Sequence, residues 1–417
     1  MRIAIVSDLH IGYERFYDDA YRQAREAFEA IAAKKADMVI IPGDIFDRRN
    51  PKPEVIAQAI NLFRDFSHNP WPAKLEEFVP LREHRKAYTD IPILAIPGTH
   101  ERVAEGKENP LTLLGLAGLL IDASEAIAVI RKGEEKVAVF GLGGLSEERV
   151  KSELADLGEK PVEGCFNIFM FHQSIYEILP FSDNFIHFED LPVGYDLYVD
   201  GHIHNRIEDK VHGKPFLIPG STVLTQLKEG EQEQKGFYIY DTKSNTWEFN
   251  RINSRPYKFF RIKLSEAAPK DVMTEAEAIM DSALAEKGEK PIIKLSFSGT
   301  IAKGFKNVDL PLHTIYTKYS NKAILDIDSS KVSEHRMEEN IKEIREGKLE
   351  GMNIKDLGME IFSSKLKEAG FRADVNPAEL FNILSSNKKE KAIKLATELL
   401  SDIDREKASN RNVSGEQ

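Results

Sequence analysis

The sequence contains a single cysteine, Cys165, no long apolar run and no excess of basic residues. One cysteine cannot form a disulfide within the chain, and Met1-Arg2 leads directly into an apolar run without the features of a secretory leader, so we expect a reducing, cytoplasmic compartment. The apolar runs fall short of the ~18 residues that a membrane-spanning helix needs, so we expect no membrane insertion. With 57 Lys and Arg against 68 Asp and Glu, the net charge of −11 argues against general adhesion to nucleic acid.

The length and composition of the chain are those of a folded, multidomain protein. The 417 residues correspond to two or three domains of about 150 residues each. Hydrophobic residues make up 41% and charged residues 30%, which excludes collagen-like, low-complexity and wholly disordered classes.

The first 255 residues alternate short apolar runs with polar or helical stretches, which predicts an α/β domain. Several runs are apolar without alternation, as in strands covered on both faces. Between the first two runs, residues 20–33 place their apolar side chains on one helical face, so the beginning of the chain has the pattern of a βαβ unit. The predicted strands are Ile3–Val6, Met38–Ile41, Ile93–Ile96, Val137–Phe140, Phe166–Phe171, Leu197–Val199, Phe216–Ile218 and Phe237–Tyr240.

The pattern changes after residue 255. An alternating strand near 259–264, a helical stretch near 276–284 and two further strands predict a small α+β domain over 256–330. Residues 331–375 are charged and have helical segments, which predicts a linker, and residues 376–404 have the pattern of two short amphipathic helices around a polar turn. Residues 405–417 lack apolar side chains, and we expect them to be disordered.

Five of the predicted strands end in carboxylate or imidazole side chains. Since the carboxyl ends of strands in an open α/β sheet form the ligand crevice, we expect these groups to converge although about 200 residues separate them along the chain. Five of the 11 histidines belong to this set. The converging residues are Asp8, His10, Asp44, His100, His172, His202 and His204.

This ligand set has the chemistry of a metal centre. Carboxylates and imidazoles without thiolates suit Mn, Fe or Zn. Four to six convergent ligands are too many for one ion, so the set favours a two-metal cluster with Asp44 as the bridging carboxylate. Two metals about 3.5–4 Å apart can hold both the attacking and the leaving oxygen of a phosphoryl group. We therefore expect hydrolysis of a phosphoester.

The same residues resemble the signature of the calcineurin-like metallophosphoesterases. All of its blocks occur in order: Asp8-Leu9-His10, Gly43-Asp44-Ile45-Phe46-Asp47, Gly98-Thr99-His100-Glu101, His172 and Gly201-His202-Ile203-His204. The resemblance implies a two-sheet sandwich flanked by helices. The chain also resembles one branch of this family, the meiotic-recombination-eleven nucleases of DNA double-strand-break repair in their archaeal form. The segments that carry this similarity are Glu189–Pro192, Pro219–Thr222 and Arg255–Tyr257.

This resemblance implies a role for each matched position. One Mn²⁺ would be held by Asp8, His10, Asp44 and His204, and a second by Asp44, His172, His202 and the residue at position 99. The family usually has an asparagine there, whereas this chain has Thr99, and Glu101 replaces the usual aspartate. His100 would orient or protonate the leaving oxygen.

The implied substrate is DNA, cut as a duplex from the 3′ end and as a single strand internally. Tyr13, Arg15, Arg48, Arg49 and Asn50 are candidates for contacts with the phosphate backbone, and an ordinary role as solvated surface residues is about equally compatible with their types. The domain over 256–330 would cap the active site and bind DNA.

The resemblance also implies partners. Two copies of the chain would form a homodimer associated with the nucleoid of a prokaryotic cell. Residues 376–404 would form a helix-loop-helix that binds a Rad-fifty-type ATPase, although a hairpin packed on its own domain fits the same pattern. The apolar residues of this segment are Leu380, Phe381, Ile383, Leu384, Leu395 and Leu399.

Two other functions fit the sequence. One is a phosphoesterase that acts on other phosphodiesters, and this function leaves the small second domain and the tail without a role. The other is a subunit that tethers DNA ends and has weakened catalysis because of Thr99.

Overall fold

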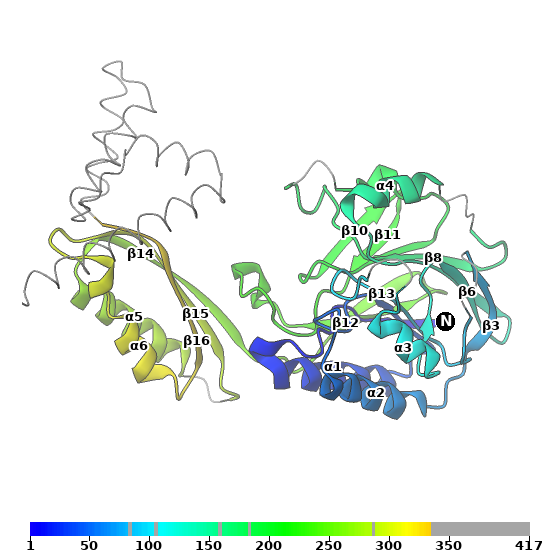
Figure 1. The fold of residues 1–417 in the computed structure, drawn as a ribbon, viewed down its shortest axis with the longest axis horizontal. Helices are drawn as coiled ribbons and strands as arrows, with labels where there is room; N and C mark the ends of the chain where they lie inside the picture. The colour runs from blue at the N-terminus through cyan, green and yellow to red at the C-terminus, as the bar shows by residue number, and fades with distance from the viewer. Residues whose placement is uncertain (82–85, 104–106, 157–160, 182–184, 286–287, 335–417) are drawn as a thin grey trace, which may run out of the picture. The chain divides into compact units, whose positions relative to one another are not determined.

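The computed structural model describes residues 1–81, 86–103, 107–156, 161–181, 185–285 and 288–334, in which two large sheets and one small sheet combine with helices (Figure 1). The first sheet has the strand order β13-β12-β1-β2-β4-β5. Its strands are β1 (Arg2–Ile5), β2 (Met38–Pro42), β4 (Ile93–Ile96), β5 (Ile121–Asp122), β12 (Gly236–Asp241) and β13 (Thr246–Arg251). Within it, β1, β2 and β4 are parallel neighbours, so their carboxyl ends lie at the same edge.

The second sheet has the strand order β10-β11-β9-β8-β7-β6-β3. Its strands are β3 (Lys74–Pro80), β6 (Ala126–Lys132), β7 (Glu135–Leu142), β8 (Phe166–Phe171), β9 (Leu197–Asp200), β10 (Ile207–Val211) and β11 (Lys214–Ile218). Strands β7, β8 and β9 are parallel, and the residues that follow β8 and β9 therefore lie together at one edge.

Three apolar clusters show how these elements are layered. Alternate side chains of a strand point to opposite faces, so Ile3 and Ile5 of β1 pack between the two sheets with Ile168 and Met170 of β8. Ala4 of β1 packs on the opposite face, in the cluster that contains the helices of the first sheet. A third cluster covers the outer face of the second sheet.

Helices complete the sandwich on both sides. The outer cluster of the first sheet includes side chains of α1 (Tyr17–Ala33), α2 (Pro53–Ser67) and α3 (Pro110–Leu116), and that of the second sheet includes α4 (Glu147–Asp156). Figure 1 shows α1 and α2 side by side, where Phe28 meets Phe63 edge to face. The predicted α/β class and the two-sheet sandwich flanked by helices are therefore confirmed.

The small sheet consists of β14 (Tyr257–Ala267), β15 (Ile292–Ile301) and β16 (Ile324–Ser333) in that order, with α5 (Pro269–Ala283) and α6 (Leu312–Tyr319) between its strands in sequence. This is the predicted small α+β arrangement. Short 3-10 helices occur at η1 (Glu14–Phe16), η2 (Phe188–Asp190), η3 (Glu229–Gln232) and η4 (Asn307–Asp309).

Two compact units divide the chain. The first comprises Met1–Ile262, Glu275–Ser296 and Leu312–Asp328, and the second comprises Lys263–Thr274, Phe297–Pro311 and the described residues from Ser329 onward. The predicted domain boundary at 255 stays a prediction. The predicted linker beyond residue 334, the helix-loop-helix at 376–404 and the disordered end at 405–417 lie outside the described residues. None of the described helices combines the length and the apolar composition that crossing a membrane requires.

Candidate metal centre

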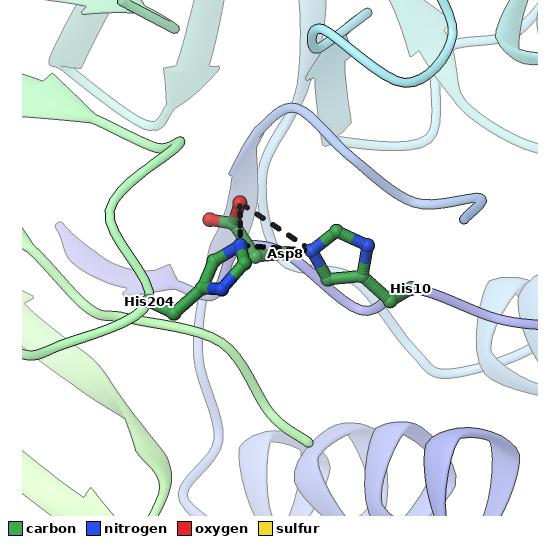
Figure 2. A group of neighbouring side chains, drawn as sticks. All are labelled: Asp8, His10 and His204. Atoms are coloured by element: carbon green, nitrogen blue, oxygen red, sulfur yellow. Dashed lines mark hydrogen bonds and ion pairs between the residues drawn. The ribbon is translucent and has the colours of Figure 1, made fainter. Parts of the chain in front are cut away.

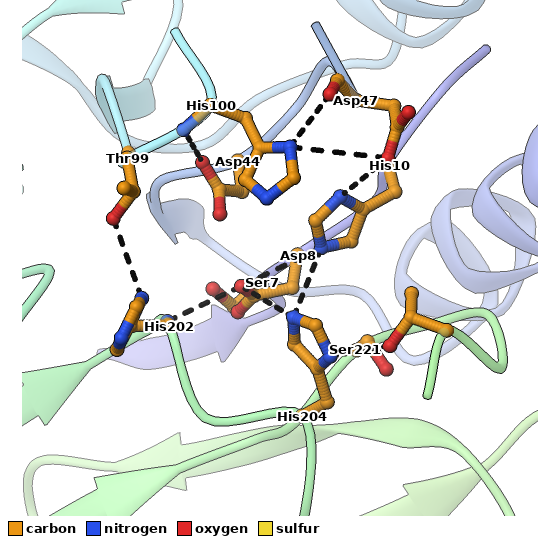
Figure 3. A network of polar contacts seen from close by, with 12 residues as sticks. Ser7, Asp8, His10, Asp44, Asp47, Thr99, His100, His202, His204 and Ser221 are labelled. Carbon is orange, nitrogen blue, oxygen red and sulfur yellow. Dashed lines mark hydrogen bonds and ion pairs between the residues drawn. The ribbon is translucent and has the colours of Figure 1, made fainter. Parts of the chain in front are cut away.

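The seven predicted ligands and His100 come from the loops that follow five parallel strands. Asp8 and His10 follow β1, Asp44 follows β2, and Thr99 and His100 follow β4. In the second sheet, His172 follows β8, while His202 and His204 follow β9. Because the two sheets pack face to face, loops of both sheets meet, and Figure 3 shows His202 and His204 of the second sheet beside ligand residues of the first.

The loops are held in a backbone conformation that non-glycine residues rarely adopt. Asp8, His10, Asp44 and His202 all have positive φ angles, of 52°, 45°, 51° and 69°. Such left-handed residues cost conformational energy and cluster at functional sites. Four of the ten described non-glycine residues with a positive φ angle are therefore predicted ligands.

Close backbone packing explains one of the glycines between them. A Cβ atom on Gly201 would lie 2.0 Å from the carbonyl oxygen of Pro42 and 2.6 Å from Nδ1 of His172. Only glycine allows the chain after β9 to pass this close to the chain after β2. This contact brings His202 and His204 into reach of Asp44 and Asp8.

Asp8, His10 and His204 form the most compact group (Figure 2). The Nε2 atoms of His10 and His204 are 3.1 Å apart, and each is 3.9 Å from Oδ1 of Asp8. Asp8 and His10 are 0% and 1% exposed. Two imidazole nitrogens and a carboxylate oxygen therefore face one another in a buried space, which is the arrangement that a cation would stabilise.

A second group joins Asp8 and Asp44 to His172. The candidate ligand atoms of these three residues all lie within 4.8 Å of one another, and Asp44 Oδ2 is 3.2 Å from His172 Nε2. Asp8 Oδ2, Asp44 Oδ2 and His172 Nε2 are buried without a hydrogen-bond partner. Buried polar atoms without partners are rare, and carboxylate and imidazole donors are those that Mn, Fe and Zn accept. The residues present thus fit divalent metal ions.

His202 and Thr99 lie beside this group. Thr99 Oγ1 is 3.3 Å from His202 Nδ1, and Ser174 Oγ is 2.9 Å from His202 Nε2. Among the described residues, three groups of side chains could hold an ion with all ligand atoms within 4.8 Å, and His202 belongs to none of them. The predicted second site is therefore less tightly assembled than the first at positions 99 and 202.

The ring nitrogens on the far side of the histidines are fixed by hydrogen bonds. His172 Nδ1 lies 2.7 Å from the carbonyl oxygen of Pro42, and His100 Nδ1 lies 2.6 Å from that of Asp47. Since a carbonyl oxygen only accepts, both Nδ1 atoms carry hydrogen and donate, which leaves Nε2 free to face the site. The Asp47 carboxylate lies 3.4 Å from His10 Nδ1. It favours a hydrogen on this Nδ1, so that Nε2 of His10 also faces the site.

Glu101 has a supporting position in the same loops. It is fully buried and accepts hydrogen bonds from the backbone N–H groups of Phe46 and Gly98, at 2.8 and 2.9 Å. Its carboxylate therefore connects the loop after β2 with the loop after β4. It does not face the ligand set as a further metal ligand.

The charges in the site shift one another's pKa values. Burial raises the pKa of Asp8 to about 6 against the opposing charge of His172. Burial lowers the pKa of His172, but the charge of Asp44, whose Oδ2 lies 3.2 Å from His172 Nε2, prevails and raises this pKa to about 10. Burial likewise opposes ionisation of Asp44, yet the charge of His172 holds the Asp44 pKa below its usual range. His202 has a pKa lowered to about 4 by burial and by the charge of His172.

These pKa values predict that metal binding releases protons. Without metal, His172 keeps its proton up to about pH 10 and Asp8 up to about pH 6, and a bound ion must displace both. Up to pH 9 the proton of His172 is displaced on binding, so the Kd for Mn²⁺ should fall roughly tenfold per pH unit. The fall should be steeper at lower pH, where Asp8 carries a proton and where His10, whose pKa is raised by Asp47 against the effect of burial, carries one as well. Isothermal calorimetry over this range, in buffers of different ionisation enthalpy, measures both the Kd and the protons released. A Kd independent of pH would contradict this assignment of His172.

The candidate substrate-binding residues are placed as follows. The Tyr13 hydroxyl donates to the carbonyl oxygen of Thr225 at 2.6 Å. Arg15 forms an ion pair with Asp326 at 2.6 Å, and Arg48 forms one with Glu14 at 2.8 Å. Arg49 and Asn50 are exposed. Their role in binding a substrate stays a prediction, and the six candidate partner-binding residues between 380 and 399 lie outside the described residues.

Four contributors to the centre were not among the predicted site residues: the carbonyl oxygen of Pro42, Asp47, Ser174 and Thr225, whose Oγ1 bonds with His204 Nδ1. A serine, a threonine or a carbonyl oxygen has no sequence signal of its own. Asp47 could have been suspected, because it stands three residues after Asp44 in the same loop.

The chain is similar to a known protein family and to several named proteins. Residues 1–206 match the model of the calcineurin-like phosphoesterase family. A rice protein named double-strand break repair protein MRE11 (Oryza sativa subsp. indica) is 27% identical over 369 residues, which cover 77% of this chain and 51% of that protein. A protein of the same name from Encephalitozoon cuniculi is 29% identical over 57% of this chain and 45% of its own length.

An archaeal relative shows the same similarity. The DNA double-strand break repair protein Mre11 of Methanocaldococcus jannaschii is 27% identical over 266 residues, which cover 60% of this chain and 65% of that protein. The chain thus spans about half the length of the plant and microsporidian relatives, and about two thirds of the length of the archaeal one.

Proposed function

Because the chain belongs to the calcineurin-like phosphoesterase superfamily through residues 1–206, we propose that it is a metal-dependent DNA nuclease subunit of a double-strand-break repair complex. The observation that carries the proposal is the buried set of carboxylates and imidazoles in which Asp8 and Asp44 are each shared between neighbouring groups. Shared carboxylates are what a two-metal phosphoesterase centre requires. The names of the relatives support DNA as the substrate.

In this proposal one Mn²⁺ is held by Asp8, His10, Asp44 and His204, and the second by Asp44, His172, His202 and Thr99. When bound, the two ions supply the positive charge that draws in the phosphodiester and activates the attacking water. This local charge compensates for the acidic balance of the chain, which is −11 overall.

His100 is the proposed acid for the leaving oxygen. Its side chain is 42% exposed, whereas the ligand His10 is buried, so the His100 ring lies where a substrate can reach it. Figure 3 shows the ring turned toward Asp44 and His10, with Nδ1 held by Asp47. His100 Nε2 is then the atom that carries a proton to the departing strand.

The remaining parts of the proposal follow the relatives and the family resemblance. Residues 256–330 cap the active site and contact DNA, and Tyr13, Arg15, Arg48, Arg49 and Asn50 contact the phosphate backbone. Residues 376–404 bind a Rad-fifty-type ATPase, and two chains form a homodimer in the prokaryotic cytoplasm at the nucleoid. The expected reactions are 3′-to-5′ removal of nucleotides from duplex DNA and internal cleavage of single strands.

One assay tests the proposal as a whole. The purified chain is incubated with end-labelled duplex and single-stranded DNA in Mn²⁺, Mg²⁺ or chelator, with and without the ATPase. Shortening of the duplex from its 3′ end that requires Mn²⁺ is the expected result. Hydrolysis of a small phosphodiester such as bis-nitrophenyl phosphate without cleavage of either DNA would instead indicate a phosphoesterase with another substrate.

Thr99 provides an observation in favour of the second candidate, a DNA-tethering subunit with weakened catalysis. Its hydroxyl is a weaker neutral ligand than an amide oxygen, and it lies next to the loosely assembled His202. If the site is weakened, Thr99→Asn should raise Mn²⁺ affinity and Mn²⁺-dependent cleavage by roughly tenfold or more, given the 10- to 100-fold effects of changes around metal sites. Thr317→Asn, on the exposed side of α6, is the matched control. Equal cleavage by Thr99→Asn and the parent chain would show that threonine is tolerated and would exclude the weakened site.

A further inference from the structure

A buried ion pair lies behind the candidate ligand His204. Glu231, in η3, and Lys235, just before β12, are 3% and 6% exposed, and Lys235 Nζ is 3.4 Å from Glu231 Oε1. Lys235 also donates to the carbonyl oxygen of His204 at 3.0 Å and to Ser221 Oγ at 3.1 Å. Lys235 of this pair therefore contacts the backbone of a predicted metal ligand directly.

Stability alone is a poor reason for such a pair. Removing two charges from water costs several kcal/mol for each ion, and well-packed apolar residues often serve a core equally well. A buried ion pair next to a predicted metal ligand is better explained by a role in positioning that ligand. In this chain Thr225 lies between the ion pair and His204, so His204 is the side chain that the pair holds in place.

Thr225 connects Glu231 to the ring of His204. Thr225 Oγ1 is hydrogen-bonded with His204 Nδ1 and lies 3.4 Å from Glu231 Oε1. A carboxylate only accepts, so the Thr225 hydroxyl donates to Glu231 and its lone pair accepts from Nδ1–H of His204. This direction places the hydrogen of the ring on Nδ1 and leaves a lone pair on Nε2.

The lone pair then points into the site. His204 Nε2 is 3.1 Å from His10 Nε2 and 3.9 Å from Asp8 Oδ1. Figure 3 shows the His204 ring directed toward these two residues. Thr225 itself is fixed at its backbone, because its carbonyl oxygen accepts from the Tyr13 hydroxyl at 2.6 Å. The other oxygen of Glu231 accepts from the N–H of Gln226 at 2.9 Å, so the carboxylate cannot turn away.

We propose that Thr225, Glu231 and Lys235 form a positioning unit that holds His204 in the tautomer and orientation required to bind a divalent ion. Hydrogen bonds to the second nitrogen of a ligating histidine set its tautomer and raise its basicity. The unit touches neither substrate nor metal and acts through His204 alone. The inference rests on the proposed function only in taking His204 as a metal ligand.

The test is a titration of the chain with Mn²⁺ alone, in which isothermal calorimetry measures the Kd. Thr225→Val removes the hydroxyl and keeps the shape, and Thr225→Ser restores the hydroxyl. Glu231→Gln removes the charge of the carboxylate, and Glu229→Gln is its control, because Glu229 lies in the same 3-10 helix and is 60% exposed. We expect Thr225→Val and Glu231→Gln to weaken Mn²⁺ binding by roughly 10- to 100-fold, and Thr225→Ser and Glu229→Gln to bind as the parent chain does.

A second measurement uses the chain without metal. Nitrogen chemical shifts of the histidine rings report which nitrogen carries the hydrogen, and His204 should be an Nδ1–H tautomer in the parent and in Thr225→Ser. In Thr225→Val the two tautomers should both be populated. Unchanged Mn²⁺ affinity in a folded Thr225→Val chain, or an equal loss in Thr225→Ser, would overturn the proposal, because the hydroxyl would then have no part in binding.

The result is independent of whether the chain cuts DNA. If the parent binds Mn²⁺ and Thr225→Val binds it weakly while neither cleaves DNA, the positioning unit stands and the nuclease function fails. If all variants bind Mn²⁺ equally and the parent cleaves DNA, the nuclease function stands and the positioning unit fails.

Discussion

Replacing Asp44 with asparagine is expected to reduce Mn²⁺-dependent cleavage by roughly a thousandfold or more. Asp44 is the residue whose carboxylate belongs both to the group with His172 and to the group with His10 and His100. A metal centre contributes several kcal/mol to transition-state stabilisation, and 1.36 kcal/mol corresponds to a factor of ten. An amide in place of this carboxylate would remove the charge that, in the proposed function, holds both ions.

The fold should survive this change. Asp44 Oδ1 accepts a hydrogen bond from the backbone N–H of His100 at 2.9 Å, and an amide oxygen can accept the same bond. Circular dichroism and thermal unfolding of the metal-free chain verify this, and Asp65→Asn is the control for loss of one carboxylate, since Asp65 is 55% exposed on α2. Mn²⁺-dependent activity that persists in a folded Asp44→Asn chain would disprove the assignment of the site.

Replacing His100 with asparagine is expected to lower kcat by roughly 10²- to 10⁴-fold, the usual contribution of a general acid. The reason is the position of the ring, which is partly exposed beside Asp44 with Nδ1 fixed by the carbonyl oxygen of Asp47. The backbone N–H that binds Asp44 is unaffected by the change. Mn²⁺ affinity should therefore remain that of the parent chain.

Steady-state kinetics at saturating Mn²⁺, together with a metal titration, separate this role from that of a ligand. The candidate groups include one in which His100 joins His10 and Asp44, so a ligand role is a real alternative. A loss of affinity as large as that of Asp44→Asn would favour the ligand role. His313→Asn, at an exposed position of α6, is the control for loss of an imidazole.

Elements with strong local patterns were predictable from the sequence. The strands before the ligand loops are continuous apolar runs, and β1, β2, β4, β8 and β9 all lie where such runs occur. Helix α2 was not among the predicted elements, although Val55, Ala59 and Phe63 recur at helical spacing and Pro53 stands at its start. The edge strands β3 and β13 are half exposed and polar, and they are strands because a neighbouring strand pairs with them.

A candidate ligand set could be predicted from the sequence because chemistry that few residue types can perform recurs at five strand ends. Asp8, His10, Asp44, His172 and His204 are brought together in the structure as that pattern indicated. The surroundings were not within reach, because hydroxyls and carbonyl oxygens are common and any of them could have supported a ring. Whether Pro42, Thr225 or Asp47 does so depends on how closely the two sheets pack.

By itself, the sequence determined the types of side chain that can bind a metal and the strands that present them, since both depend on local pattern. The tertiary structure alone decided how the histidines are oriented and which charges are already paired, such as Arg15 with Asp326 and Glu231 with Lys235. These contacts join residues far apart in the chain or buried by its folding, and their distances follow from the packing of the sheets and loops. Electrostatic energies change steeply with distance and burial, so the chemistry of the site depends on that packing.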